Sequence, residues 1–93
     1  MEFEWDSTKD ASNLCKHGVP FDFAKSAWDD SGRVERPDTR SDYGEPRCIS
    51  FARIGVRVYV ITHTQREGRT RIISARKANS RETRNYEICQ VHS

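Results

Sequence analysis

Long hydrophobic runs are absent from this 93-residue chain: no stretch approaches the ~20 apolar residues that a membrane-spanning helix needs. Cysteine is scarce. Cys15, Cys48 and Cys89 lie far apart, without a Cys-x-x-Cys pair, which argues against a disulfide framework or a zinc knuckle. A Walker loop, a dinucleotide fingerprint and a His-rich metal motif are also missing. The acidic N-terminus lacks a signal-peptide core. We therefore expect a cytoplasmic protein that contacts no membrane and needs no cofactor and no metal.

Acidic residues are scarce in one half of the chain and abundant in the other. Residues 1–45 carry six Lys/Arg against eleven Asp/Glu, whereas residues 46–93 carry ten against three. The net charge of +2 therefore hides a chain that is polarised along its length. Arginine outnumbers lysine twelve to four, and a planar guanidinium matches phosphate oxygens better than an ammonium does. This composition favours a ligand with regularly spaced phosphates.

The N-terminal half predicts a short strand followed by two helices, within a single domain over residues 1–93. Alternation over residues 2–5 indicates the strand. Asp6 is a good N-cap for a helix that ends at Gly18, with an inward face of Ala11, Leu14 and Cys15. In the second helix the inward stripe is Phe21, Ala24, Ala27 and Trp28.

The C-terminal half predicts three strands and a helix. The strands span about residues 47–53, 56–63 and 69–76, and their short connections indicate an antiparallel meander. A helix follows over about 79–89, with Thr83, Tyr86 and Ile88 or Cys89 inward. Between the halves, residues 29–46 predict a turn and, because of Pro37, at most an edge strand near Val34. The expected fold class is α+β: an antiparallel β-sheet with two N-terminal helices and one C-terminal helix.

The most basic segment runs from Arg69 to Tyr86. The segment contains six basic residues and a single acid, Glu82. A predicted strand ends within it and a helix begins, with Asn79 or Ser80 as the N-cap. Strand alternation predicts one face with Arg71, Ile73 and Ala75, and another with Ile72, Ser74 and Arg76. Exposed arginines are more often simply solvated, so a structural interpretation competes with an anion site.

RNA cleavage is a reaction that such side chains can support. The 2′-hydroxyl attacks the adjacent phosphate, and the enzyme needs a base, an acid and cations around the phosphorane, without a metal. His63 closes the central strand, so we expect its ring at the sheet rim, where it could move protons while arginines hold the phosphate. Glu82 is an alternative base or a helix N-terminal acid. The candidate catalytic residues are His63, Arg66, Arg71, Arg76 and Glu82.

A second group of residues is predicted to bind RNA through charge alone: Lys16, His17, Arg69, Lys77, Arg81 and Arg84. For Lys16 and His17, capping of a helix C-terminus is an equally good explanation. The third histidine, His92, is expected in a disordered tail.

Two stretches resemble the BrnT toxin family. The first is Phe3-Glu4-Trp5-Asp6 with Lys9, Asn13, Lys16-His17-Gly18-Val19 and Phe21. The second is His63-Thr64, then Arg71-Ile72-Ile73-Ser74-Ala75-Arg76-Lys77-Ala78, then Glu82 and Tyr86. Together they cover both ends and nearly the whole length.

The resemblance implies a fold similar to RelE-type ribonucleases and the toxin half of a type II toxin–antitoxin pair. Such a toxin cleaves RNA and halts growth and translation. Its partner would be a BrnA-type antitoxin with a ribbon-helix-helix region, in a hetero-oligomer such as a heterotetramer that binds operator DNA and represses its own operon. The resemblance does not identify the catalytic residues.

Two other classes remain open: a non-catalytic nucleic-acid-binding module, and an interaction protein whose acidic half meets a basic partner. Aromatic side chains on the basic strands would favour the binding module, because bases stack on them. Only Phe51 and Tyr59 qualify, and both alternate like core residues.

Overall fold

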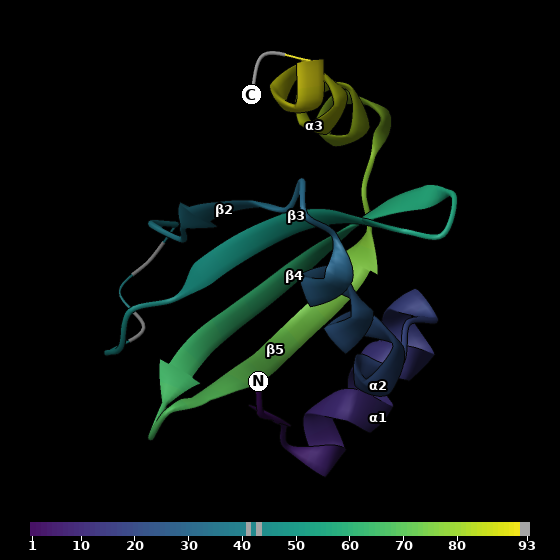
Figure 1. The fold of residues 1–93 in the computed structure, drawn as a ribbon. Helices are drawn as coiled ribbons and strands as arrows, with labels where there is room; N and C mark the ends of the chain where they lie inside the picture. Colours follow the sequence, from purple (N-terminus) through teal and green to yellow (C-terminus); the bar gives the residue numbers. More distant parts are fainter. Residues whose placement is uncertain (41, 43, 92–93) are drawn as a thin grey trace.

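The computed structural model describes residues 1–40, 42 and 44–91 (Figure 1). His92, predicted to be a tail residue, lies outside the described residues, as do residues 41 and 43 of the 29–46 segment. The elements in chain order are β1 (Phe3–Glu4), α1 (Ser7–His17), α2 (Phe21–Ala24), the 3₁₀ helix η1 (Lys25–Asp29), β2 (Val34–Pro37), β3 (Cys48–Ile54), β4 (Arg57–Arg66), β5 (Arg69–Lys77) and α3 (Ser80–Val91). This confirms the α+β class.

The sheet is five-stranded and mixed, with the order β1-β5-β4-β3-β2. Strands β3 to β5 form the predicted antiparallel meander, and β2 pairs with β3 as the edge strand that Pro37 required. The prediction of a purely antiparallel sheet is wrong, because β1 adds to β5 in parallel, with Phe3 opposite Thr70. No hairpin joins these two strands, so no turn imposes an antiparallel direction on them.

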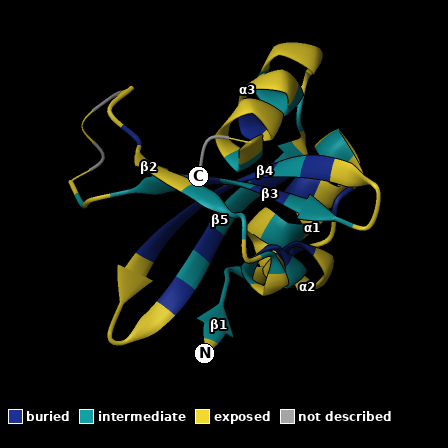
Figure 2. Ribbon diagram, turned by 45° about the horizontal axis from the view of Figure 1, so that its top comes forward, coloured by how far each residue is buried: buried dark blue, intermediate teal, exposed yellow. Residues whose placement is uncertain are grey.

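The hydrophobic core lies between the sheet and the segment that runs from Val19 through α2 and η1. Val19, Phe21, Ala24 and Ala27 pack against Ala52, Ile61, Ile72 and Ala75, all nearly inaccessible to solvent. The stripe predicted for the second helix is therefore confirmed, with Trp28 half-buried at its end. Figure 2 shows the buried residues concentrated in the central strands, whereas α3 is largely exposed.

A β-bulge in β5 overturns the predicted faces of that strand. His63 pairs with Ile72 while Thr62 pairs with Ser74, so Ile73 has no counterpart on β4. The extra residue reverses the alternation, and Ile72 and Ala75 both point into the core although three positions separate them. Arg76 consequently lies on the face away from α2 and η1, in register with Val60.

Helix α1 begins and ends where the sequence predicts. The carboxylate of Asp6 accepts hydrogen bonds from the N–H groups of Thr8 and Lys9, and Gly18 ends the helix with φ 72°. The predicted inward face is wrong: Leu14 is 49% exposed, and Ala11 and Cys15 are exposed too.

The buried residue of α1 is Asn13, and its amide joins the helix to the sheet. Its Nδ2 donates to the carbonyls of Val19 and Ala75, both at 2.9 Å, and its Oδ1 accepts from the N–H of Ala75 at 3.1 Å. Beyond Arg71, β5 has no strand on its outer side among the described residues. The amide thus satisfies backbone groups that a neighbouring strand would otherwise pair.

Helix α3 is held by a reciprocal cap and by polar contacts. Asn79 Oδ1 accepts from the N–H of Glu82 at 2.8 Å, and a Glu82 oxygen accepts from the N–H of Asn79 at 2.9 Å. Tyr86 is buried as predicted and donates to Asp30. Ile88, however, is 50% exposed, and Cys89 is exposed as well.

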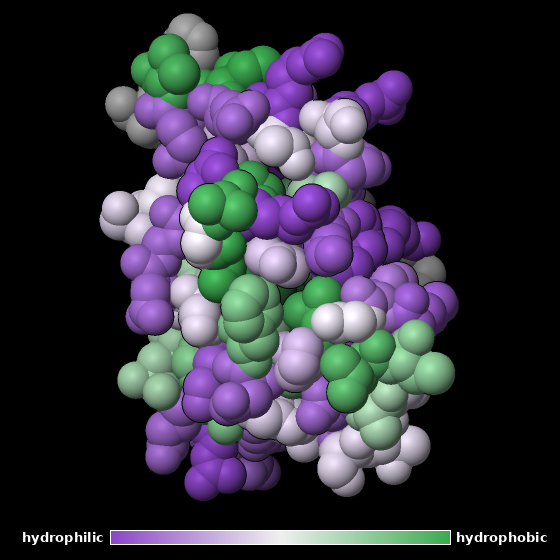
Figure 3. Space-filling model, turned by 90° about the vertical axis from the view of Figure 1, so that its right-hand side faces the viewer, coloured by the Kyte–Doolittle hydropathy of each residue, from purple (hydrophilic) through white to green (hydrophobic). Residues whose placement is uncertain are grey.

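Large hydrophobic side chains are also exposed elsewhere, at Met1, Phe23, Val56 and Val91. Figure 3 shows that hydrophobic atoms on one side of the molecule lie among hydrophilic ones.

We predict that Asn13→Ala destabilises the protein by about 2–4 kcal/mol, because it leaves buried backbone groups of Ala75 and Val19 without partners. The adjacent substitution Leu14→Ala should cost less than about 1 kcal/mol. Urea unfolding of the two variants tests this. A larger cost for Leu14→Ala than for Asn13→Ala would contradict the orientation of α1.

Candidate functional site

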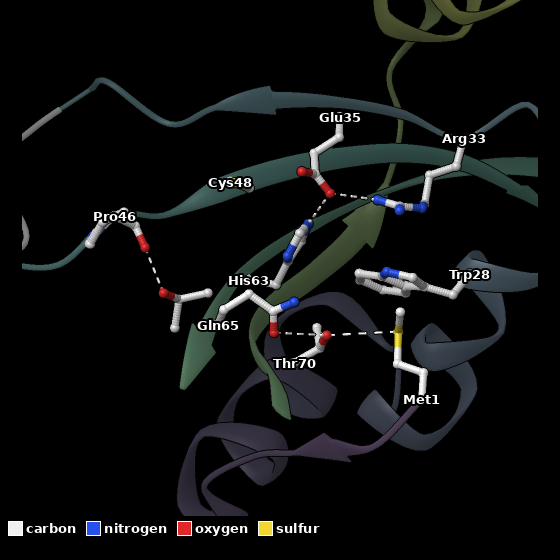
Figure 4. Close-up of a pocket in the computed structure, with 10 residues that line it drawn as sticks. Met1, Trp28, Arg33, Glu35, Pro46, Cys48, His63, Gln65 and Thr70 are labelled. Atoms are coloured by element: carbon white, nitrogen blue, oxygen red, sulfur yellow. Dashed lines mark hydrogen bonds and ion pairs between the residues drawn. The ribbon is translucent and has the colours of Figure 1, made fainter. Parts of the chain in front are cut away.

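A buried polar cluster surrounds His63 on the helix-covered face of the sheet. His63 Nε2 lies 2.7 Å from Ser50 Oγ and 3.8 Å from Glu35 Oε1. Arg33 Nη1 donates to both of these oxygens at 2.7 Å, and the ring of Trp28 stands edge-on to the imidazole at 4.9 Å. Trp28, Arg33, Glu35 and His63 line a cavity of about 400 Å³ together with Cys48, Gln65 and Thr70 (Figure 4).

Burial lowers the pKa of His63 to about 4; the Arg33 cation acts in the same direction, and Glu35 opposes both. Only 4% of the residue is exposed. The expectation of a ring at the sheet rim is wrong, because β4 continues to Arg66 and Trp28 covers the imidazole. At neutral pH His63 is therefore uncharged and hydrogen-bonded inside the protein.

The predicted arginines near the β4–β5 turn are held by acids from the N-terminal half. Arg66 pairs with Glu45 at 2.9 Å, and Arg71 pairs with Glu4 at 2.8 Å. Arg69 lies 3.5 Å from Glu2 and 3.8 Å from Glu4. The charge polarity along the sequence is therefore partly cancelled in space.

The structure does not bring the five candidate catalytic residues together. Ala75 and Ile61 are partners in the core, and His63 lies on their side of the sheet, whereas Arg76 lies on the other side. Val60 of β4 is the partner of Arg76. Arg66 lies six residues further along β4, about 20 Å from Val60. A single phosphate cannot contact both arginines. Arg76 and Glu82 share one site, whereas Arg66 and Arg71 lie near the β4–β5 turn.

That site is a groove of about 470 Å³ on the open face of the sheet. The end of α1 contributes Lys16 and His17, β5 contributes Arg76, and the first turn of α3 contributes Glu82. The full lining is Lys16, His17, Arg40, Ile49, Phe51, Val60, Thr62, Ser74, Arg76 and Glu82. Cationic and imidazole side chains surround an apolar floor, an arrangement that attracts phosphate.

Arg76 and Glu82 form a two-pronged ion pair inside the groove, with Nη1–Oε1 and Nη2–Oε2 both at 2.8 Å. The hydrogen bond from Arg76 lowers the pKa of Glu82, and the N–H of Asn79 lowers it further against the effect of burial. The same bond raises the pKa of Arg76. With 39% of its side chain exposed, Arg76 still presents its guanidinium to a ligand.

The other residues predicted to bind RNA lie outside the groove. Lys77, Arg81 and Arg84 are exposed, on β5 and α3. Six of the ten groove residues were not predicted as site residues, and Arg40 and Phe51 are two of them. Arg40, held by Asp38 at 2.8 Å, follows a segment with no interpretable pattern. Phe51 alternates like a core residue, and its position became clear only from the sheet register.

Among residues 1–40, 42 and 44–91, no group of three His, Cys, Asp or Glu side chains is arranged to hold a metal ion. None of the described helices is both long and apolar enough to cross a membrane.

The α+β fold with a cationic groove defines a protein suited to binding a phosphate-bearing ligand. The family model described as "Ribonuclease toxin, BrnT, of type II toxin-antitoxin system" matches residues 5–82. The chain therefore belongs to the BrnT family of ribonuclease toxins, which confirms the resemblance seen in the sequence. Membership implies an RNA substrate and an antitoxin partner. No curated protein matches the chain.

We predict that the free energy of unfolding falls as the pH drops from about 6.5 to about 4, by up to about 3 kcal/mol. In that window the unfolded chain binds a proton at His63 that the folded protein does not. Urea unfolding between about pH 7 and about pH 5 measures the slope. In His63→Gln the slope should be shallower. An equal slope in both proteins would show that His63 is not the group responsible.

Proposed function

We propose that this BrnT-family protein is a metal-independent endoribonuclease with a RelE-like fold, and that its active site is the groove on the open face of the sheet. The observation that carries the proposal is the convergence of Lys16, His17 and Arg76 on one concave surface. The strands of the described residues share one sheet and one core, which supports a single toxin domain over residues 1–93. An RNA substrate favours the cytoplasm as its location.

The proposed reaction is an internal transfer at phosphorus. The 2′-oxygen forms a bond to the adjacent phosphorus while the bond to the 5′-oxygen breaks, so the products are a 2′,3′-cyclic phosphate and a 5′-hydroxyl. One group removes the proton of the 2′-hydroxyl and another protonates the leaving oxygen. Cations stabilise the charge that builds on the non-bridging oxygens.

The groove contains side chains suited to each of these tasks. Arg76 and Lys16 would hold the phosphate, and Arg40 would add positive charge at the far wall. His17 would move protons, since the ring nitrogens of an imidazole can donate and accept them. Glu82 would orient Arg76, because its carboxylate is already engaged with both guanidinium nitrogens. An incoming phosphate would share or displace that carboxylate.

The groove is a better phosphate site than the cavity at His63. Arg33, the one Lys or Arg among the described residues that line the cavity, already donates to Glu35 and Ser50. The imidazole there is neutral at physiological pH. The arginines at the β4–β5 turn are likewise engaged with Glu45 and Glu4. A phosphate that bound at the β4–β5 turn would have to break those pairs.

We predict that the purified protein cleaves single-stranded RNA in the presence of EDTA and leaves 5′-hydroxyl ends. His17→Ala should lower the rate about a hundredfold, as expected for the loss of a proton-transfer group. Lys16→Ala should lower it by a similar factor, because a cation at the transition state is lost. Gel analysis of end-labelled RNA, with kinase labelling of the 5′ ends, measures both effects.

Arg66→Ala is the control. The side chain of Arg66 is exposed about as much as that of the groove residue Arg76, but it lies outside the groove. The variant should cleave like the wild type, and thermal unfolding should verify that every variant is folded. Strict dependence on added magnesium would refute the mechanism. RNA binding without any cleavage would favour the non-catalytic module, and a strong effect of Arg66→Ala alone would move the site to the β4–β5 turn.

We further infer that the antitoxin is of the BrnA type, with a ribbon-helix-helix region, and that the hetero-oligomer of the two proteins represses their operon. To silence the groove, the antitoxin would lay an acidic or amphipathic segment over it and onto α3. Arg81 and Arg84 supply exposed charge there, and Ile88 supplies exposed apolar area.

Reversing the charge at Arg81 should slow association with the antitoxin without abolishing the complex, because rim charges act mainly on the association rate. Lys9→Glu is the control: Lys9 lies in the first turn of α1, at the opposite end of that helix from the groove residues Lys16 and His17. Stopped-flow association at low and high salt compares the two variants. An unchanged association rate for Arg81→Glu would exclude α3 from the docking surface.

A further inference from the structure

One row of side chains crosses four strands on the open face of the sheet, and three of these side chains, Phe51, Val60 and Arg76, line the groove. Val34 of β2 is opposite Phe51 of β3, Phe51 is opposite Val60 of β4, and Val60 is opposite Arg76 of β5. Partners in an antiparallel sheet point to the same face, so all four lie on the open side. Phe51 and Arg76 are two strands apart, which corresponds to about 10 Å.

Phe51 is not part of the hydrophobic core. It is half-buried, it lines the groove, and it does not belong to the buried cluster on the other face of the sheet. Its ring lies under the guanidinium of Arg36, with Cζ 5.0 Å from the ring centroid. A ring that stacks with an exposed planar cation can also stack with another planar group.

We propose that Phe51 and Val60 form a subsite for one nucleobase of single-stranded RNA, next to the phosphate held by Arg76. The proposal rests on the ribonuclease function proposed above and extends it to how the substrate is recognised. The backbones of Phe51 and Arg76 are about 10 Å apart across the sheet. The long arginine side chain can span part of this distance, so that one nucleotide would reach from the ring to the guanidinium. A base stacked there would align the sugar–phosphate backbone along the basic wall of the groove.

The same floor offers polar atoms beside the ring. Thr62 and Ser74 face each other across β4 and β5 in the neighbouring row, and both line the groove. Their hydroxyls can donate or accept hydrogen bonds at the edge of a base or at a ribose. Stacking tolerates every base, because each has a π face, so the hydroxyls would supply whatever base preference the site has.

The test measures binding of a labelled 2′-O-methyl hexanucleotide, which lacks the 2′-hydroxyl needed for cleavage, by fluorescence anisotropy. Phe51→Leu keeps an apolar side chain but removes the ring, and it should weaken binding about tenfold. Phe51→Tyr keeps the ring and should bind like the wild type. Tyr59→Leu removes an aromatic ring from the other face, where Tyr59 packs on Phe23, and it should also bind like the wild type.

A series of hexanucleotides with one abasic position each identifies the stacked base. At that position the wild type and Phe51→Leu should bind equally, since the interaction is already absent; at the other positions the tenfold difference should persist. Thermal unfolding of each variant separates lost binding from lost folding.

The outcomes separate the two proposals. If the wild type cleaves RNA in EDTA while Phe51→Leu binds as tightly as the wild type, the subsite is wrong and the ribonuclease proposal stands. If binding depends on Phe51 but no RNA is cleaved, the ribonuclease proposal fails and the subsite stands. If the abasic series shows the same Phe51 effect at every position, the ring does not stack a base and the subsite proposal is overturned.

Discussion

The contact between the Asn13 side chain and the backbone of Ala75 sets much of the geometry of this protein. One amide bonds both the N–H and the carbonyl of a strand residue, as the backbone of an adjacent strand would. The outer side of β5 is thereby closed by a helix beyond the short β1. Because α1 is held at this point, its last turn lies beside Ser74 and Arg76, and Lys16 and His17 become part of the groove.

Ion pairing decides which of the many arginines remain available to a ligand. Glu2, Glu4 and Glu45 approach Arg69, Arg71 and Arg66, and these pairs lie near the β4–β5 turn. In the groove Glu82 engages Arg76 and Asp38 engages Arg40, whereas Lys16 and His17 also line the cavity. The positive charge of the groove therefore lies at the Arg76 end of β5, and α1 supplies part of it through Lys16.

The pair formed by Arg76 and Glu82 also links the groove to α3. Glu82 belongs to the reciprocal cap that starts the helix, so a ligand that competes for Arg76 acts on a residue that stabilises the helix N-terminus. Further along, α3 is held by Tyr86 and Gln90 through polar contacts to Asp30 and Gly32. Few apolar contacts bind this helix to the sheet, which makes it the element most easily adjusted by a ligand or an antitoxin.

Local chemistry was sufficient to predict the elements and the family. Asp6 and Gly18 mark the ends of α1 because caps depend on neighbouring residues alone, and the alternating strands β3 to β5 follow from period-two patterns. The stretch from Arg71 to Ala78 carries the family resemblance in its residues.

What the sequence did not reveal depends on contacts between distant segments. The bulge at Ile73 changes which side chains of β5 share a face. Strand β1 pairs in parallel with β5, which is far from it in the sequence, and Trp28 covers His63. The tertiary structure therefore decided the site: it separated His63 and Arg66 from Arg76, and it brought Lys16, His17 and Phe51 to the groove, because only packing determines which distant residues meet.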